Sequence, residues 1–342
     1  MSELKDDHMI RSLLGEFRRM NPDFEIGVID VGAREGIHER WKSIESYAQF
    51  IGFEPDSEEY GRLVVQGEKD TNVKYLNTAL HSRKGTLDFH LLKARQTSSV
   101  LLPNLETLGR FPEVERFEIE KTVALKVDTL DNALRGNKIE NVDFMKLDTQ
   151  GSELSILEGA TRVLQGVFGL EIEVEFVELY QDQALFGEVD RFVRKRGFEL
   201  FDLRPNYWKR KVCPDLGGIK GQLVFADALY LRTVDSVISF ADSNMQTKIL
   251  KSIALSVVFG YFDYAFEIAE RSRRKGLLSG RILELLTAYA EQNTSRTLQF
   301  RGKGRLVNLL YRLLRVLDPC CRLGLRQVGG WSACGNYLAN IE

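Results

Sequence analysis

Three segments of this sequence place glycine or charged residues at the end of an apolar, strand-like run, where a ligand can reach them. The first, Asp30-Val-Gly-Ala-Arg-Glu-Gly36, contains Gly32, Ala33 and Gly36. Glycine lets a ligand approach the backbone closely, and the N–H groups that open a following helix attract an anionic group. Arg34 stands where the GxGxxG fingerprint has its second glycine, which argues against a nicotinamide dinucleotide.

The second segment, Glu54-Pro55-Asp56, follows the apolar run 50–53. Glu54 comes 24 positions after Asp30, and a carboxylate at this distance from a glycine loop can accept hydrogen bonds from both hydroxyls of a ribose. Taken alone, such a carboxylate is as well explained by a solvent-facing residue or a helix cap. Together with the glycine loop it predicts a nucleoside site.

The third segment, Lys146-Leu-Asp-Thr-Gln-Gly-Ser-Glu153, leaves a buried strand and enters a helix. Ser152 is explained as a helix cap. Lys146 and Asp148 flank a leucine on an apolar strand, where a charge costs desolvation free energy unless it is paired or functional. We expect Asp148 to be the catalytic base or the group that positions the acceptor, with Lys146 and Glu153 as supporting contacts.

Carboxylates also recur on the next apolar run, at Glu171, Glu173 and Glu175. Their period of two places them on one face of a strand, which is either a solvated face or part of the site. We take Glu173 as a further candidate catalytic residue, and a divalent metal between Asp148 and Glu173 stays open as an alternative. His38 and His81 have no evident partner and are interpreted as surface residues.

At these residues the sequence resembles the FkbM-type S-adenosylmethionine-dependent methyltransferases, over about residues 26–204. The resemblance rests on several motifs in the right order and spacing, namely Asp30-Val-Gly-Ala with Gly36, Phe53-Glu-Pro55, Asn77-Thr-Ala-Leu80, Thr129-Leu-Asp131, Lys146 to Glu153 followed by Leu157-Glu-Gly-Ala160, and Gly197-Phe198. One departure is Arg34, where the family often has asparagine.

The resemblance implies how a bound S-adenosylmethionine lies on this chain. The loop with Asp30, Gly32, Ala33 and Gly36 would lie against the methionine part of the cofactor. Glu54, with Pro55, would hold the ribose. The turn from Asn77 to Ala79 would lie beside the adenine.

The elements that position these segments alternate between apolar β-branched runs and helical patterns, which predicts an α/β fold with a mainly parallel sheet. The resemblance makes this a class I methyltransferase, Rossmann-like sheet, and the pattern adds a closing antiparallel strand. We predict strands at 28–33, 50–55, 73–80, 141–148, 167–176, 198–203 and 223–231, and helices at 36–46, 57–65, 152–164 and 188–196. Residues 87–127 read as a hairpin followed by a mobile insertion that could form a lid.

The C-terminal end differs from the rest of the chain. We divide the sequence into a helical segment at 1–25, a methyltransferase domain at 26–234 and an α-helical C-terminal appendage at 235–342. From Arg296 onward eight basic and two acidic residues give a net charge of +6, although the whole chain has −2. A basic amphipathic helix at about 303–317 either docks on its own domain or makes peripheral contact with an anionic membrane.

The amino-acid composition limits the classes of function that the protein can have. With 44% apolar and 28% charged residues and no long apolar run, the chain reads as a soluble, cytoplasmic globular protein. Four cysteines and four histidines form no metal-binding spacing, so we expect no metal site. The net charge argues against nucleic acid as a partner. We predict an O-methyltransferase for a hydroxyl of a sugar, glycan or related metabolite; the alternatives are a polyketide or nitrogen acceptor, or a non-catalytic scaffold.

Overall fold

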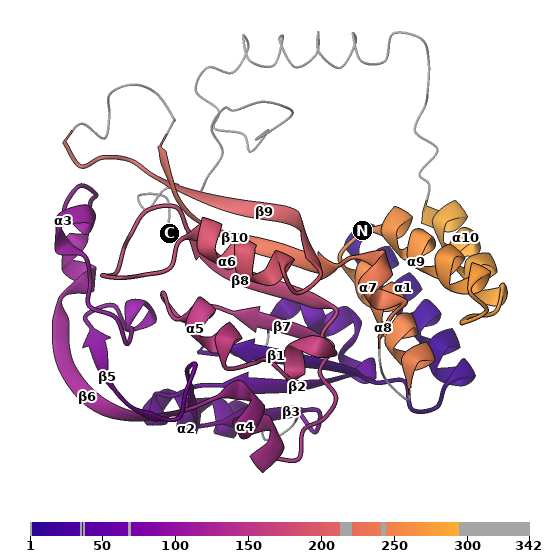
Figure 1. The fold of residues 1–342 in the computed structure, drawn as a ribbon, viewed down its shortest axis with the longest axis horizontal. Helices are drawn as coiled ribbons and strands as arrows, with labels where there is room; N and C mark the ends of the chain where they lie inside the picture. The colour runs from indigo at the N-terminus through magenta and orange to yellow at the C-terminus, as the bar shows by residue number, and fades with distance from the viewer. Residues whose placement is uncertain are drawn as a thin grey trace, which may run out of the picture.

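The fold is a seven-stranded sheet with helices on both faces (Figure 1). The computed structural model describes residues 2–34, 36, 38–67, 70–212, 221–240 and 244–293. The strand order is β3-β2-β1-β7-β8-β10-β9, and β10 runs antiparallel to both of its neighbours while the other pairs are parallel. The seven strands are β1 (Ile26–Val31), β2 (Ala48–Phe53), β3 (Val73–Leu76), β7 (Phe144–Leu147), β8 (Gly169–Glu175), β9 (Phe198–Trp208) and β10 (Gln222–Arg232).

This arrangement confirms the predicted α/β class with its mainly parallel sheet and antiparallel strand. Every residue of β1 is buried, as expected for a central parallel strand that is covered on both faces. The two strands predicted at 198–203 and 223–231 form the closing antiparallel hairpin at the edge of the sheet, with β10 next to β8 and β9 outermost. The carboxyl ends of β1, β2 and β7 meet at one edge of the sheet, which is where ligands bind in open α/β sheets.

Two hydrophobic cores fill the space between the sheet and its helices. One face carries Ile29, Met145 and Ile172 and is covered by α4 (Leu130–Gly136), α5 (Glu153–Glu158) and α6 (Phe186–Arg194). The opposite face carries Val28 and Phe144. It shares one core with five other helices, which are α1 (Ser2–Met20), α7 (Val234–Val237), α8 (Met245–Val258), α9 (Phe262–Arg274) and α10 (Arg281–Asn293).

The predicted strand at 73–80 is wrong, because the chain divides there between two sheets. β3 ends at Leu76, whereas β4 (Ala79–Leu80) pairs with β6 (Ile119–Asp128) in a three-stranded sheet completed by β5 (Gly85–Leu92). The strands β5 and β6 flank the insertion rather than precede it. The connection, with α3 (Leu105–Leu108), has a small core of its own that includes Phe111, Tyr180 and Trp208.

Two predicted helices are shorter than expected. Instead of a helix at 36–46, the chain forms the 3₁₀ helices Glu39–Ser43 and Glu45–Tyr47. Trp41 and Ile44 are both buried, and a spacing of three residues suits a 3₁₀ turn. The helix predicted at 152–164 ends at Glu158 and is followed by the 3₁₀ helix Val163–Gln165. Gly159 follows it at a point where an added Cβ would lie 2.4 Å from the carbonyl oxygen of His81.

A buried ionic cluster at the amino end of β7 links α8 to the sheet. Asp143 is 1% exposed and accepts hydrogen bonds from Lys248 Nζ at 2.7 Å, Lys251 Nζ at 3.1 Å and the Gly27 backbone N–H at 2.8 Å. Lys251 also donates to Asn141 Oδ1 at 2.6 Å. Helix α8 is therefore part of the packing of the sheet, although it lies far from β1 and β7 in sequence.

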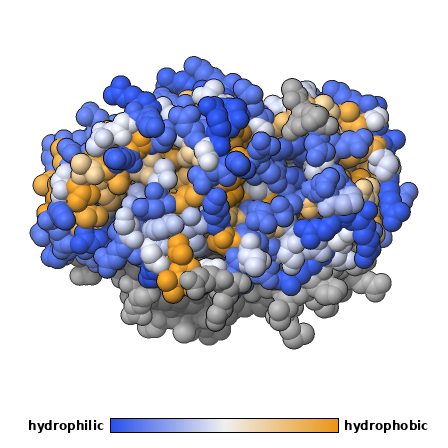
Figure 2. Space-filling view, turned by 90° about the horizontal axis from the view of Figure 1, so that it is seen from below, coloured by the Kyte–Doolittle hydropathy of each residue, from blue (hydrophilic) through white to orange (hydrophobic). Residues whose placement is uncertain are grey.

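Among the described residues no helix is both long and apolar enough to cross a membrane. Hydrophilic residues cover most of the face seen in Figure 2, with apolar residues showing between them. The basic helix expected at about 303–317 and all four cysteines lie outside the described residues. The division of the chain into three regions stays a proposal.

We predict that Asp143→Ala destabilises the protein by about 3 kcal/mol, since removing one partner of a buried ionic cluster leaves the other charges uncompensated. Urea denaturation followed by circular dichroism measures this. The matched control is Glu106→Gln, which removes an exposed partner of Arg110 and should leave the free energy of unfolding nearly unchanged. A loss below about 1 kcal/mol in Asp143→Ala would mean that the cluster does not hold α8 in place.

Candidate active site at the carboxyl ends of the strands

A cavity of about 460 Å³ opens at the carboxyl ends of β1, β2 and β7. Its volume falls in the range of small-molecule and cofactor sites. Eight of the predicted site residues line it, namely Asp30, Gly32, Gly36, Glu54, Pro55, Ala79, Lys146 and Asp148. Four others, Ala33, Asn77, Glu153 and Glu173, do not line it, and each has a different position.

The glycine loop is folded back against both neighbouring strands. Gly32 has φ +87°, and a Cβ there would lie 2.0 Å from the carbonyl oxygen of Asp148, so only glycine fits. The backbone N–H groups of Gly32 and Ala33 both donate to Phe53 O at 3.1 Å. Ala33 points at the backbone of Gly52 rather than into the cavity, which explains why it is absent from the lining.

Glu54 is 4% exposed and lines the cavity from the end of β2. Burial raises the pKa of its carboxyl to about 7, although its Oε1 accepts a hydrogen bond from Asp56 N at 2.9 Å. Asn77 does not face the cavity, because its side-chain amide donates to Glu54 O at 2.9 Å and Pro55 O at 3.2 Å. Asn77 thus fixes the loop that presents Glu54, while Thr78 and Ala79 supply the lining there.

Arg34 also has a defined position. Its guanidinium lies 3.5 Å from Asp56 Oδ2, and its carbonyl accepts a hydrogen bond from Arg62 at 2.9 Å. Arg34, where the sequence departs from the family pattern, therefore connects the glycine loop to the loop of Glu54.

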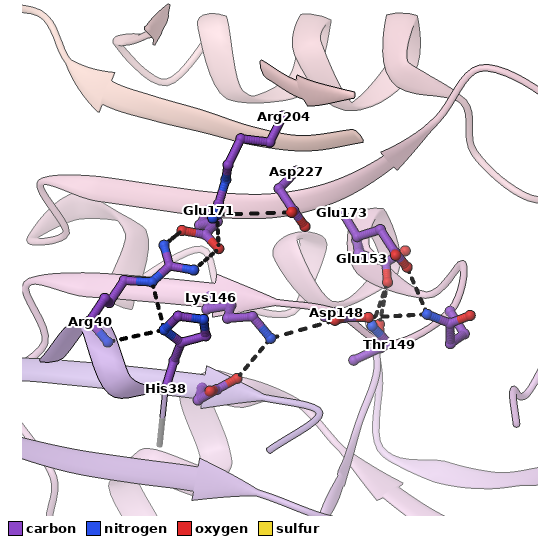
Figure 3. Close-up of polar contacts among 12 residues, drawn as sticks. His38, Arg40, Lys146, Asp148, Thr149, Glu153, Glu171, Glu173, Arg204 and Asp227 are labelled. Carbon is purple, nitrogen blue, oxygen red and sulfur yellow. Dashed lines mark hydrogen bonds and ion pairs between the residues drawn. The ribbon is translucent and has the colours of Figure 1, made fainter. Parts of the chain in front are cut away.

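Lys146 stands between two carboxylates, as Figure 3 shows for its contact with Asp148. Its Nζ lies 3.6 Å from Asp30 Oδ1 and 3.5 Å from Asp148 Oδ2. Burial acts to lower the pKa of Lys146, but Asp30 and Asp148 raise it above its ordinary value, so the ammonium stays charged. Burial also raises the pKa of Asp30 to about 6, against the effect of Lys146. Lys146 thus contacts both carboxylates, and Asp148 is the one with the more accessible side chain, at 35%.

Glu153 holds the turn after β7 instead of facing the cavity. Its carboxylate accepts hydrogen bonds from the backbone N–H of Thr149 at 2.6 Å, the Thr149 hydroxyl at 2.9 Å and the N–H of Gly151 at 3.0 Å. Burial raises the pKa of Glu153 to about 7. Glu153 thus fixes the turn that carries Asp148, and its expected role as a supporting contact stays a prediction.

Glu173 is connected to Asp148 through Gln150. The Gln150 amide nitrogen donates to Glu173 Oε2 at 2.7 Å and to Asp148 Oδ1 at 3.1 Å, and its amide oxygen lies 3.1 Å from the Tyr180 hydroxyl. Burial, and then the charge of Asp148, raise the pKa of Glu173 well above its usual range. An amide thus occupies the place that a metal between Asp148 and Glu173 would need, and no group of residues suited to hold a metal ion is found among the described ones.

Sequence reasoning missed several residues that shape the site. Gln150 lies inside a motif that was recognised, and its φ of +58° is a strained conformation for a non-glycine residue. Arg95, Gln96 and Ser98 reach the cavity from the connection between β5 and β6, which no strand-end pattern indicates. His38 was not among these: it was interpreted as a surface residue close enough to the first loop to border the pocket, and it is exposed and lines the cavity.

The sequence matches the family model described as the methyltransferase FkbM domain over residues 30–200, half of the chain. The chain belongs to the FkbM methyltransferase family. The predicted family and enzyme class are therefore confirmed, and S-adenosylmethionine is the cofactor that goes with them. Among characterised proteins, the chain is 22% identical over 194 residues to methyltransferase sdnD of Sordaria araneosa, covering 51% of this chain and 73% of that protein.

Solved structures with a similar chain path are also methyltransferases. An rRNA methylase from Streptococcus thermophilus is 12% identical, with a TM-score of 0.32, and covers 66% of this chain and 93% of its own. The magnesium protoporphyrin IX methyltransferase of Synechocystis was solved with bound S-adenosylmethionine and is 8% identical, with a TM-score of 0.32. The match covers 66% of this chain and 79% of that protein. The expectation that nucleic acid is no partner stays a prediction.

The buried Glu54 carboxyl predicts an unusual dependence of stability on pH. Its pKa of about 7, raised from 4.5 by burial, means that the folded protein holds the proton more tightly than the unfolded chain. Stability is therefore lost as the pH rises from 4.5 through 7. Glu54→Gln keeps the acceptor oxygen and carries no charge. Its free energy of unfolding should therefore exceed that of the wild type by up to about 3 kcal/mol at pH 8 and equal it at pH 4.

Urea denaturation at these two pH values measures the difference. Glu58→Gln, at an exposed glutamate in the following helix α2 (Ser57–Gly67), is the matched control and should shift neither curve. Equal stability of wild type and Glu54→Gln at pH 8 would show that Glu54 is not buried as a charged group.

Proposed function

We propose that this chain is an S-adenosylmethionine-dependent O-methyltransferase whose acceptor is a hydroxyl group of a sugar, a glycan or a related metabolite. The observation that carries the cofactor's placement is the buried oxygen Asp30 Oδ1. Asp30 lines the cavity, and among the described residues this oxygen accepts no hydrogen bond, since its ion-pair partner Lys146 Nζ lies 3.6 Å away. Such an atom is costly unless a ligand supplies the donor, and an amino group would do so.

The other lining residues suit the remaining parts of the cofactor. Asp30, Gly32 and Gly36 would hold the methionine part, the Glu54 carboxylate the ribose hydroxyls, and Ala79 with Thr78 the adenine. Ala33 and Asn77 would not contact the cofactor; they would fix the backbone of the glycine loop and of the Glu54 loop, respectively. When bound, the cofactor supplies a methyl group on a sulfonium that is already activated for transfer.

The protein's part in the reaction is alignment and proton removal. The Asp148 carboxylate would accept the proton of the acceptor hydroxyl, while the bound cofactor would supply the methyl group to the acceptor oxygen. Lys146 orients that carboxylate through its 3.5 Å contact, and Gln150 holds the other carboxylate oxygen at 3.1 Å. Glu173 and Glu153 act through these contacts, Glu173 by way of Gln150 and Glu153 by way of the turn.

The expected result of a calorimetric titration with S-adenosylhomocysteine is binding by the wild type and by Asp148→Asn, and affinity at least tenfold weaker in Glu54→Ala. Methyl transfer from labelled S-adenosylmethionine, screened over a glycan panel, should fall by about 10² to 10⁴ in Asp148→Asn, because general-base catalysis is lost. Glu178→Gln, outside the cavity, is the control for both measurements.

Three other results would each decide against part of this proposal. Binding of S-adenosylhomocysteine without transfer to any acceptor would favour the scaffold. Transfer to a polyketide hydroxyl or to nitrogen would replace the acceptor class. Full activity of Asp148→Asn would remove Asp148 as the base.

We also propose peripheral contact with the inner face of a membrane through the basic amphipathic helix at about 303–317. The support is the sequence alone, with Leu306, Leu310 and Leu313 on one stripe and a net charge of +6 from Arg296 onward. Co-sedimentation with vesicles rich in phosphatidylserine should recover the full chain but not a chain ending at residue 295. Equal recovery of both would rule out the contact.

A further inference from the structure

A second cavity, of about 320 Å³, lies beside the first on the same face of the sheet. His38 lines both cavities, so a ligand in one is next to a ligand in the other. None of the cofactor-binding roles proposed above uses this second cavity. It is large enough for one small ring.

Strand register brings the polar groups of this cavity together. Lys146 on β7 pairs with Glu171 on β8, and on the far side of β8 the pairing of β10 with β9 sets Asp227 beside Arg204. All these residues share the face of the sheet that carries Asp30, since alternate residues of the same strands enter the opposite core. A row of charges therefore runs across the sheet from the first cavity into the second, as Figure 3 shows from Lys146 to Arg204.

The charges in the second cavity largely neutralise one another. Glu171 is 3% exposed and is held by Arg40, one of whose contacts is at 2.9 Å, and by Arg204 at 2.7 Å. Arg204 also lies 3.9 Å from Asp227. An ionic ligand would have to compete with these pairs, whereas a neutral hydroxyl can share their remaining lone pairs and N–H groups.

One wall of the cavity is aromatic and comes from the turn after α8. Phe259 stacks on Phe144 with ring centroids 4.9 Å apart, and Tyr261 packs edge-on against Phe201 at 5.1 Å. The Tyr261 side chain is only partly buried, and its hydroxyl has no hydrogen-bond partner among the described residues. The wall thus offers a fixed apolar surface with a polar tip, which suits the C–H face of a ring.

We infer that the second cavity is the acceptor subsite and takes a neutral, hydroxyl-rich ring such as a sugar unit. The inference rests on the proposed function and names its substrate class. The ring would lie against Phe259 and Tyr261. Its hydroxyls would contact Asp202, Asp227 and Arg204, and one hydroxyl would extend past His38 toward Asp148.

Much of this subsite lies beyond the part of the chain that matches the family. The family match ends at residue 200, whereas Asp202, Arg204, Asp227 and Tyr261 all follow it. Acceptor choice would therefore be set by residues outside the shared domain, including those of the α8–α9 turn. The part of the subsite within the match consists of Arg40, Glu171 and His38, the last of which also lines the first cavity.

Saturation-transfer NMR on the full chain with S-adenosylhomocysteine tests the inference directly. The probes are the methyl glycosides of glucose, mannose, galactose, fucose and rhamnose. At least one should bind, and its affinity should fall at least tenfold in Tyr261→Ala and at least threefold in Asp202→Asn. Asp202 is exposed, so the second variant keeps the test valid if the first fails to fold.

The matched control is Phe266→Ala, an exposed aromatic residue on α9 outside the cavity, which should bind glycoside like the wild type. S-adenosylhomocysteine affinity should be equal in all these variants. No binding by any glycoside, binding unaffected by Tyr261→Ala and Asp202→Asn, or tighter binding of a sugar phosphate would each overturn the inference. Failure to bind S-adenosylhomocysteine, with glycoside binding intact, would instead overturn the proposed function.

Discussion

The candidate site depends on one buried ammonium group. Lys146 would be unstable on so apolar a strand without counter-charges, and the two carboxylates beside it would repel each other without Lys146. The parallel pairing of Asp30 with Lys146 sets the first contact, and the turn after β7 sets the second. Because one carboxylate faces the proposed cofactor position and the other the acceptor, this cation couples the two halves of the site.

The same alternation of charge continues across the sheet. Glu171 follows Lys146 on the next strand, and Arg40 and Arg204 follow Glu171. Lys146 and Glu171 lie on neighbouring strands, Arg204 lies on β9, and Arg40 lies in the 3₁₀ helix Glu39–Ser43. The contacts between the strand residues therefore depend on correct strand register. The glutamates that looked like a solvated face in sequence are in fact held in place: Glu171 by two arginines, and Glu173 by an amide.

Sequence patterns predicted the strand ends well, because a buried parallel strand is a continuous apolar run and its carboxyl end is where charge reappears. Asp30, Glu54 and Asp148 were found this way. The patterns could not show that Asn77 and Glu153 turn toward the backbone, since that depends on local hydrogen bonds. They also gave no sign of Arg95 or Tyr261, because these residues reach their cavities from elements distant in sequence. The segment 36–46, predicted as an α-helix, forms 3₁₀ helices instead.

The ionic cluster at Asp143 limits where the chain can be cut to give a fragment that still folds. Strand β7 carries a buried carboxylate at its amino end, satisfied by α8, and the site's lysine near its carboxyl end. A fragment cut after residue 234 would leave that carboxylate without its lysines and expose the apolar face that α8–α10 cover. The segment that matches the family therefore depends on these helices for its packing in this chain. A chimera that exchanges this segment between relatives would need to include the helices α8–α10 as well.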